Sequence, residues 1–596
     1  MAINQERPKN PFIYSTPDQI ENAQEALNLF VDVFKDFHLV ESPGNTFIHG
    51  ARGSGKSMMF RIMRPDCQLI KQEKKGIWDL SYYSIYVPVK NTSLNIQELN
   101  ILTEKKHVVR LLNEHLMCLY ISISIFRELS GEDYTDLGTD FSDEMKSFFE
   151  KDFKKVLLNS GYELNAGQEV VGESANEVFS QIVEVLEGIL GTFSYYIKRL
   201  ILSTDSFNYQ GPLCLYRNFL SPLISLVNGF SCLPKDCPIY LLIDDADLLS
   251  EVQTRILNSW VSFRSTSTVC FKVTTQLSYK TYWTANSNNK IDSPHDYHEV
   301  NLSEVYTSNM KARYRDNLKD MVERRLKYIS GIEASAEEFF PANLKQEKEY
   351  QKLFDKLEEE KGYDYAYRNA RLDYMMSLTN KYSYSYAGFE QLVHLSSGII
   401  RNFVDLAFKM FDKATRHNEG KGVNHIPVKI QNEEIRDYAN WVHLQLDKGA
   451  VDSDLLTPLK VNPHAQLKTL IDSIGIAFRK FLISDTSERR KFSFYFDGEV
   501  DEEMMKVLKL GVSEGLFHYS KQGSKTGLGR SHKYVLNRIL SPAYDLDPFS
   551  FTGYLYLTPK NLTLAVKDQK RFLKYIDDRI AGGDVESEEN QLEIDF

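Results

Sequence analysis

The chain has 596 residues, 42% of them hydrophobic and 26% charged, so several globular domains are expected rather than one. The net charge of −11 argues against nucleic-acid binding by the molecule as a whole and requires a local basic patch for any such binding. The six cysteines form no CxxC pair and Met1–Asn10 is polar, which favours a cytoplasmic protein without a zinc site or secretory signal.

The N-terminal region predicts one amphipathic helix. Thr16 is the expected N-cap, Pro17 stands in the first turn, and the helix is expected to continue to about Phe37.

A complete phosphate-binding motif follows this helix. The short apolar run Asn45–His49 predicts a strand, and a helix is expected after the motif until Pro65. Between them the chain fits GxxxxGK[ST], with these residues as candidate nucleotide ligands: Gly50, Ala51, Arg52, Gly53, Ser54, Gly55, Lys56 and Ser57. Backbone N–H groups of such a loop point at phosphate, Lys56 reaches the terminal phosphates, and the Ser57 hydroxyl binds Mg²⁺. The alternative is a glycine-rich turn that matches the pattern by chance.

The next segment predicts a strand at Tyr82–Val89, where Pro88 indicates an edge or a strand end. A long helix is expected over Glu104–Leu129, and its most apolar run, Leu116–Phe126, is too short to span a bilayer. Residues from about 130 to 210 look polar and irregular around one helix, Ala175–Ile201, and predict an insertion into the nucleotide-binding domain.

A second candidate site element is the run Ile239–Ile243, five apolar residues followed by two aspartates. Such a run suits a strand buried on both faces of a parallel sheet, and its carboxyl end is where ligands bind. Asp244 is expected to orient Mg²⁺ through water, and Asp245 to activate the attacking water. Taken alone, the same residues are equally compatible with a buried strand and a capping acidic turn.

Two more strands complete the predicted sheet. Val269–Val273 ends in Thr274 and Thr275, and Thr275 is a candidate contact to the γ-phosphate or the water, although simple strand termination explains a threonine there equally well. His298–Leu302 is the last strand expected.

The C-terminal part predicts a separate module. Ile471–Leu482 and Asp501–Glu514 are helical, and a hairpin joins Leu516–Ser520 to Lys533–Leu536, a combination typical of a winged helix. The hairpin carries four basic residues with no acidic residue between them, namely Lys521, Lys525, Arg530 and Lys533. They form a candidate contact to a DNA backbone, and a solvated hairpin that contacts protein is an equal alternative. The acidic tail, 584–596, is expected to be disordered or a docking segment.

The order of these motifs resembles that of AAA+ ATPases of the origin-recognition initiator type. The chain is similar to the bacterial origin-recognition-like ATPases, which with the neighbouring STAND class are often linked to defence against phages and plasmids. The resemblance implies an α/β P-loop ATPase with a parallel sheet, a helical lid, a C-terminal winged helix, and ATP with Mg²⁺ as ligands. It also implies that Arg401, in a GxxR setting, is a sensor-2-like residue that reaches the γ-phosphate.

Two departures from the family pattern bear on the rate of hydrolysis. Asp245 stands where most AAA+ proteins have Glu, and Thr274 or Thr275 stands where Asn is expected. Both leave nucleotide binding intact and put rapid turnover in doubt. Arg264 is a weak candidate for an arginine finger acting on a neighbouring subunit.

The expected domains are 1–310 for the nucleotide-binding domain, 311–430 for the lid, 465–545 for the winged helix and 546–596 for a C-terminal extension. The leading hypothesis is an ATP-binding and hydrolysing switch that oligomerises or controls an effector protein, with a role in prokaryotic defence. Two alternatives stay open: a DNA-binding initiator or loader, and a nucleotide-binding scaffold with little turnover.

Overall fold

The structure, a computed structural model, describes most of the chain. The described residues are 9–90, 106–164, 172–202, 209–263, 266–277, 279–285, 289–302, 311–378, 384–418, 422–456, 462–484, 490–523, 530–549 and 553–582.

The chain forms two compact units. The sheet unit contains Thr16–Gly50 and Lys56–Leu302, and the helical unit contains Met1–Ser15, Ala51–Gly55 and Ser303–Phe596. The middle of the phosphate-binding motif therefore belongs to the helical unit, while its first residue and its lysine belong to the sheet unit.

A five-stranded parallel sheet with the order β2-β3-β4-β1-β5 is the centre of the sheet unit. Its strands are β1 (Thr46–His49), β2 (Tyr83–Pro88), β3 (Ile239–Asp244), β4 (Val269–Thr275) and β5 (His298–Asn301). Every residue of β1, β3 and β4 is buried, and the central strand β3 is accordingly a nearly continuous apolar run. The strand β2 lies at one edge, as Pro88 predicted.

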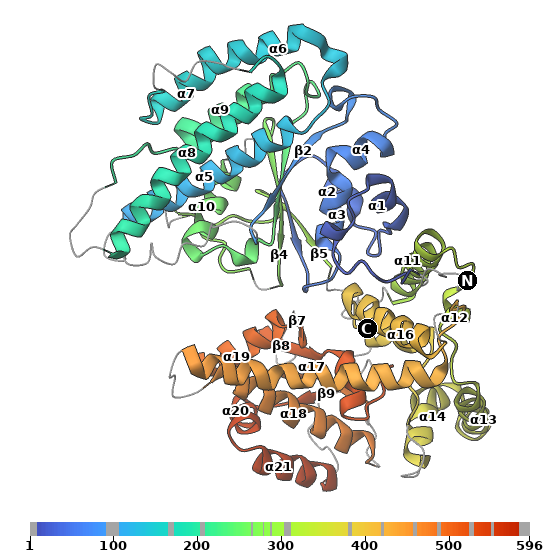
Figure 1. Ribbon diagram of the computed structural model, residues 1–596. Coiled ribbons are helices and arrows are strands. Elements are labelled where there is room, and N and C mark those ends of the chain that lie inside the picture. Colours follow the sequence, from blue (N-terminus) through green and yellow to red (C-terminus); the bar gives the residue numbers. More distant parts are fainter. Residues whose placement is uncertain are drawn as a thin grey trace. The chain divides into compact units, whose positions relative to one another are not determined.

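Helices cover both faces of this sheet, with α1 to α4 on one side and α5 to α10 on the other (Figure 1). The first group is α1 (Ala23–Leu29), α2 (Phe37–Glu41), α3 (Lys56–Met63) and α4 (Pro65–Lys71). The second is α5 (Lys106–Ser130), α6 (Gly138–Ser147), α7 (Lys154–Asn159), α8 (Ala175–Leu202), α9 (Ser221–Val227) and α10 (Glu251–Ser262). This is the layered α/β arrangement expected of a P-loop fold.

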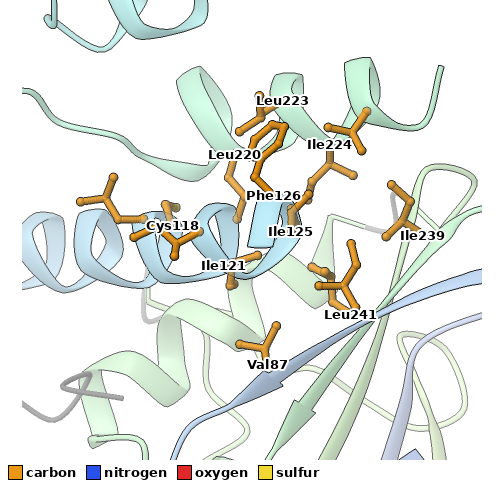
Figure 2. Packing of buried hydrophobic residues seen from close by; sticks show 14 of the residues in the cluster. Val87, Cys118, Ile121, Ile125, Phe126, Leu220, Leu223, Ile224, Ile239 and Leu241 are labelled. Carbon is orange, nitrogen blue, oxygen red and sulfur yellow. The ribbon is translucent and has the colours of Figure 1, made fainter. Parts of the chain in front are cut away.

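The main core lies between the sheet and the second group of helices. Figure 2 shows Val87, Ile239 and Leu241 of the sheet facing Ile121, Ile125 and Phe126 of α5, with Leu220, Leu223 and Ile224 beyond them. By length and composition α5 could cross a membrane, but 67% of its apolar stretch is buried in the protein, as expected of a core helix.

Two sequence-based expectations for this unit were wrong. The predicted helix from Pro17 to Phe37 is a short 3₁₀ turn followed by α1, because Asn22 caps a new helix by accepting a hydrogen bond from the Glu25 N–H. The segment expected to be irregular after residue 130 contains α6, a π-helical stretch at Phe148–Phe153 and α7. Its aromatic residues Phe141, Phe149 and Phe153 are buried against the α5 and α8 core, which offsets the cost of ordering its many polar residues.

The helical unit begins with a series of helices. They are α11 (Lys311–Ser330), α12 (Ala336–Phe339), α13 (Leu344–Lys361), α14 (Tyr363–Ser377), α15 (Phe389–Leu395), α16 (Ile400–His417), α17 (Val428–Leu456) and α18 (Pro463–Leu482). Further along the chain come α19 (Glu502–Ser513), α20 (Pro559–Lys567) and α21 (Gln569–Ala581).

A second sheet of this unit has the order β7-β8-β6-β9. The predicted hairpin is confirmed as β7 (Phe517–Gly523) paired antiparallel with β8 (Arg530–Leu536). The strand β6 (Lys491–Phe496) pairs antiparallel with β8, and β9 (Gly553–Tyr556), which pairs parallel with β6, was not expected. The alternating residues Tyr554, Leu555 and Tyr556 are typical of a strand, so a short local signal was overlooked there.

His115 of α5 is a buried titratable group in the core of the sheet unit. Its Nδ1 accepts a hydrogen bond from the Cys214 N–H at 2.9 Å, and its Nε2 lies 3.2 Å from the Tyr209 hydroxyl. Burial lowers the pKa of His115 to about 4, so the ring is neutral at pH 7.

We expect His115 to make the sheet unit sensitive to acid. The unfolded histidine binds a proton near pH 6.5 and the folded one only near pH 4, so stability falls as the pH drops between these values, by up to about 1.4 kcal/mol per pH unit. Denaturant unfolding followed by tryptophan fluorescence at pH 7 and pH 5 measures the effect. In His115→Gln, whose side chain does not titrate, the free energy of unfolding should fall less between pH 7 and pH 5. An equal fall in both proteins would show that His115 is not the source of the acid sensitivity.

Candidate nucleotide-binding site

The phosphate loop leaves the sheet between β1 and α3. The Gly50 N–H donates to the Thr275 carbonyl of the neighbouring strand β4 at 3.2 Å, which continues the parallel pairing by one residue. Gly53 and Gly55 have φ values of +84° and +101°, in the left-handed region that glycine adopts without a Cβ penalty.

Lys56, the first residue of α3, is buried, and its Nζ donates to the Gly50 carbonyl at 2.7 Å across the base of the loop. Ser54 is buried too, and among the described residues its Oγ has no hydrogen-bond partner. Ser57 is partly buried, and Arg52 is exposed. A buried hydroxyl without a partner is costly unless a ligand completes it, so the interior of the loop suits a polar ligand.

The loop makes close contact with the start of α16. The Arg401 N–H donates to the Gly53 carbonyl at 3.0 Å, and a Cβ added to Gly53 would lie 2.4 Å from the Arg401 Cβ. A Cβ on Gly55 would lie 3.2 Å from Ile400 Cδ1. No side chain fits at residue 53, so glycine is required there for packing as well as for conformation.

The acidic pair at the end of β3 is held by three donors. The Asp244 carboxylate is buried and accepts hydrogen bonds from the Thr274 hydroxyl, from the Tyr86 hydroxyl at 3.0 Å and from the Asp245 N–H at 3.1 Å. Thr274 also accepts from the Asp245 N–H at 2.9 Å. These bonds fix the orientation of Asp244 and the turn that follows it.

Asp245 adopts a left-handed conformation with φ of +58°, which is uncommon for a residue other than glycine. Burial raises the pKa of its carboxyl, and Asp244 and Asp247 raise it further, while Lys56 and Lys90 lower it. A carboxylate with a raised pKa is a stronger base once ionised, which suits proton abstraction from water.

Thr274 and Thr275 take different roles at the end of β4. The Thr274 hydroxyl hydrogen-bonds the acidic pair, whereas the buried Oγ1 of Thr275 has no partner in the part of the chain that the structure describes. A contact of Thr275 with a ligand stays a prediction. Sequence reasoning missed Tyr86. In the parallel pairing of β2 with β3 its register partner is Leu242, two residues before Asp244, which its hydroxyl reaches.

His49, directly before the loop, is a second residue that the sequence did not single out. It is buried, with Nδ1 3.4 Å from the Gln276 carbonyl and Nε2 3.6 Å from the Glu299 carboxylate. Burial lowers its pKa and Lys56 acts in the same direction, while Glu299 opposes both. The ring therefore adds no positive charge beside Lys56 at neutral pH.

The residues present fit a nucleotide with Mg²⁺. Ser57 and Asp244 offer a hydroxyl and a carboxylate, the oxygen ligands that Mg²⁺ prefers beside phosphate oxygens. The orphaned hydroxyls of Ser54 and Thr275 and the glycine-lined loop supply polar groups for phosphate.

Other predicted site residues lie elsewhere or outside the description. Arg401 is partly buried at the start of α16, as its contact with Gly53 requires. Lys533 lies partly buried on β8. The backbones of Lys521 and Arg530 belong to β7 and β8, but their side chains lie outside the described residues, as do Lys525, Arg264 and the acidic tail.

We expect Gly53→Ala to destabilise the protein, because its Cβ would overlap the Arg401 Cβ and because its φ disfavours any side chain. The expected loss is at least about 1–2 kcal/mol, seen as a lower midpoint of thermal unfolding by circular dichroism. Gly188→Ala is the matched control, since a Cβ within α8 meets nothing within 4 Å and should raise stability slightly. An unchanged or higher midpoint for Gly53→Ala would contradict the packing described.

No curated protein matches the chain. The solved structures that match include two with low sequence identity and low TM-score. Cdc6p from Pyrobaculum aerophilum has 10% identity and a TM-score of 0.26, over 90% of this chain and 97% of that one. The Orc1 protein of Aeropyrum pernix, solved in complex with DNA, has 11% identity and a TM-score of 0.27, over 91% and 97%.

TM-scores this low establish no shared arrangement of the whole chain, so the family profile carries the assignment. The profile of the ORC-CDC6-like family matches residues 10–365 and 347–555, which together make up most of the sequence. With its parallel sheet, its complete phosphate-binding motif and its acidic strand end, the chain belongs to the ORC-CDC6-like family of nucleotide-binding AAA+ ATPases.

Proposed function

We propose that the protein is an ATP-binding and hydrolysing switch that oligomerises or controls an effector protein. One observation carries this proposal: the Gly53 carbonyl in the middle of the phosphate loop is hydrogen-bonded to the start of α16. A loop that reorganises around phosphate cannot do so without affecting this bond, which supplies the two-state element that a switch needs.

In this proposal each site residue has a distinct role. Loop N–H groups and Lys56 bind the phosphates, Ser57 and Asp244 hold Mg²⁺, and Asp245 accepts a proton from the attacking water. When bound, Mg²⁺ would neutralise charge on the phosphates. Thr275 and Arg401 complete the set as contacts of the terminal phosphate.

The biological setting is proposed from the resemblance alone. In this proposal the switch acts in the cytoplasm of a prokaryote, in defence against phages, with residues 311–430 as a lid and 465–545 as a winged helix. A scaffold that binds nucleotide with little turnover is the nearest rival, because Asp245 is one methylene shorter than the usual Glu.

DNA binding is a second candidate function, favoured by the hairpin of β7 and β8. Its tip, from Lys521 to Lys533, carries four basic residues and no acidic one in a chain of net charge −11. Such a tip suits contact with phosphates rather than reading of bases.

Lys56→Ala should weaken binding of Mg-ATP by at least about tenfold, because alanine cannot supply the charge-assisted hydrogen bonds of an ammonium group. Calorimetry with the full chain measures the affinity. Lys71→Ala is a suitable control, since this lysine pairs with Glu41 at the surface of the same unit. Equal affinity of wild type and Lys56→Ala would remove the basis of the proposed function.

Asp245→Asn should keep the affinity for Mg-ATP and slow turnover by about a hundredfold or more, the range of general-base catalysis. Since burial raises the pKa of Asp245, wild-type turnover should also fall in acid at a pH above the ordinary range of an aspartate. Steady-state phosphate release measures both effects. Wild-type turnover that is negligible at saturating ATP would favour the scaffold, and equal turnover in the variant would place the base elsewhere.

If the hairpin binds DNA, affinity for a labelled duplex should fall steeply with salt and vary little with sequence. Replacing Lys521, Lys525, Arg530 and Lys533 with alanine should flatten the salt dependence, with the midpoint of thermal unfolding as the control for folding. Absence of salt-sensitive binding by the wild type, with and without ATP, would rule out the DNA-binding function.

A further inference from the structure

The turn between α15 and α16 is held in an unusual conformation. Ser397 and Gly398 both have positive φ, +54° and +75°, and Ser396 and Ser397 are fully buried. A left-handed serine costs about 1–2 kcal/mol, so contacts around the turn must maintain it. We call Ser396–Ile399 the α16 turn.

One side of the α16 turn is tied to the C-terminal part of the chain. The Ser397 hydroxyl lies 3.1 Å from Nε2 of His518 on β7 and accepts a hydrogen bond from the Arg538 N–H at 3.3 Å. Next to this contact, a Cβ on Gly515 would lie 3.7 Å from Ile399 Cδ1. Two residues of the α16 turn thus touch the segment that leads into β7 and the one that leaves β8.

The bond between Ser397 and His518 accommodates either tautomer of a neutral ring. The Ser397 oxygen accepts from the Arg538 N–H, and its own proton can donate to His518 Nε2 when the ring proton is on Nδ1; in the other tautomer Nε2–H donates to the second lone pair of the oxygen. Burial and, to a smaller extent, the Arg538 charge lower the pKa of His518 to about 4, so the ring is neutral at physiological pH.

The other side of the α16 turn leads directly to the phosphate loop. Two residues after Ile399, the Arg401 N–H bonds the Gly53 carbonyl, and Ile400 lies beside Gly55. A buried turn that is hydrogen-bonded on both sides transmits a displacement from one side to the other, because close packing leaves it no room to deform.

We propose that His518 is a positioning residue of the nucleotide site, which acts through Ser397 to hold Arg401 against the phosphate loop. This inference rests on the proposed function. Its consequence is that the hairpin which carries His518 and the bound nucleotide influence one another, since coupling between two sites is reciprocal. A purely structural His518 would affect unfolding but would leave the preference between ATP and ADP unchanged.

The test compares affinities for Mg-ATP and Mg-ADP by calorimetry with the full chain. His518→Phe retains a buried ring but removes the nitrogen that hydrogen-bonds Ser397. The affinity for Mg-ATP should fall about tenfold, the order expected for one buried hydrogen bond. The affinity for Mg-ADP, which lacks the phosphate that Arg401 is proposed to contact, should fall by less than about twofold. His518→Gln, whose amide oxygen can accept the same bond, should restore most of the affinity.

Two further variants keep the test decisive if His518→Phe folds poorly. Ser397→Gly deletes the hydroxyl and suits the left-handed backbone, so it should reproduce the loss for Mg-ATP. His532→Phe changes a histidine on the paired strand β8 that hydrogen-bonds Tyr519, and it should leave both affinities unchanged. A wild type that binds neither nucleotide would refute the proposed function, whereas wild-type binding with unchanged ATP preference in His518→Phe and Ser397→Gly would refute the role of His518 alone.

Discussion

The close approach of the phosphate loop to α16 is the constraint on which the proposed site depends. The Gly53 carbonyl and the Arg401 N–H are joined at 3.0 Å, and the space that a Cβ would need at Gly53 is occupied by Arg401. A glycine that a phosphate-binding motif needs for its backbone conformation here also permits helix contact. One residue therefore serves the ligand and the helix together, which makes the loop and α16 difficult to change independently.

At the acidic end of β3, side chains from both neighbouring strands hold a single carboxylate. Asp244 is held by Thr274 on one neighbouring strand and by Tyr86 on the other, which leaves Asp245 to be oriented by the backbone turn. The pairing of β3 between β2 and β4 brings these hydroxyls to a single carboxylate. Asp245, the proposed general base and one methylene shorter than the usual Glu, thus follows a rigidly held residue, and burial raises its pKa in the direction that this role favours.

Much of this arrangement could be predicted from sequence because its signals are local. The glycine spacing of residues 50–57, the apolar run before Asp244 and the hairpin of β7 and β8 each depend on neighbouring residues alone. The helices after residue 130 were missed because they are stabilised by packing on α5 and α8 and not by a strong local pattern. Tyr86, His49 and the bond between Ser397 and His518 were missed because each joins residues distant in sequence, which no local pattern encodes.

In the proposed switch, nucleotide in the loop is sensed at α16 and, through the α16 turn, at β7. Hydrogen exchange of the whole chain, measured by mass spectrometry with and without Mg-ATP, follows all three segments at once. We expect Mg-ATP to slow exchange in peptides that cover the phosphate loop, the α16 turn with Arg401, and the start of β7. Protection confined to the phosphate loop, with exchange at the α16 turn and β7 unchanged, would contradict it.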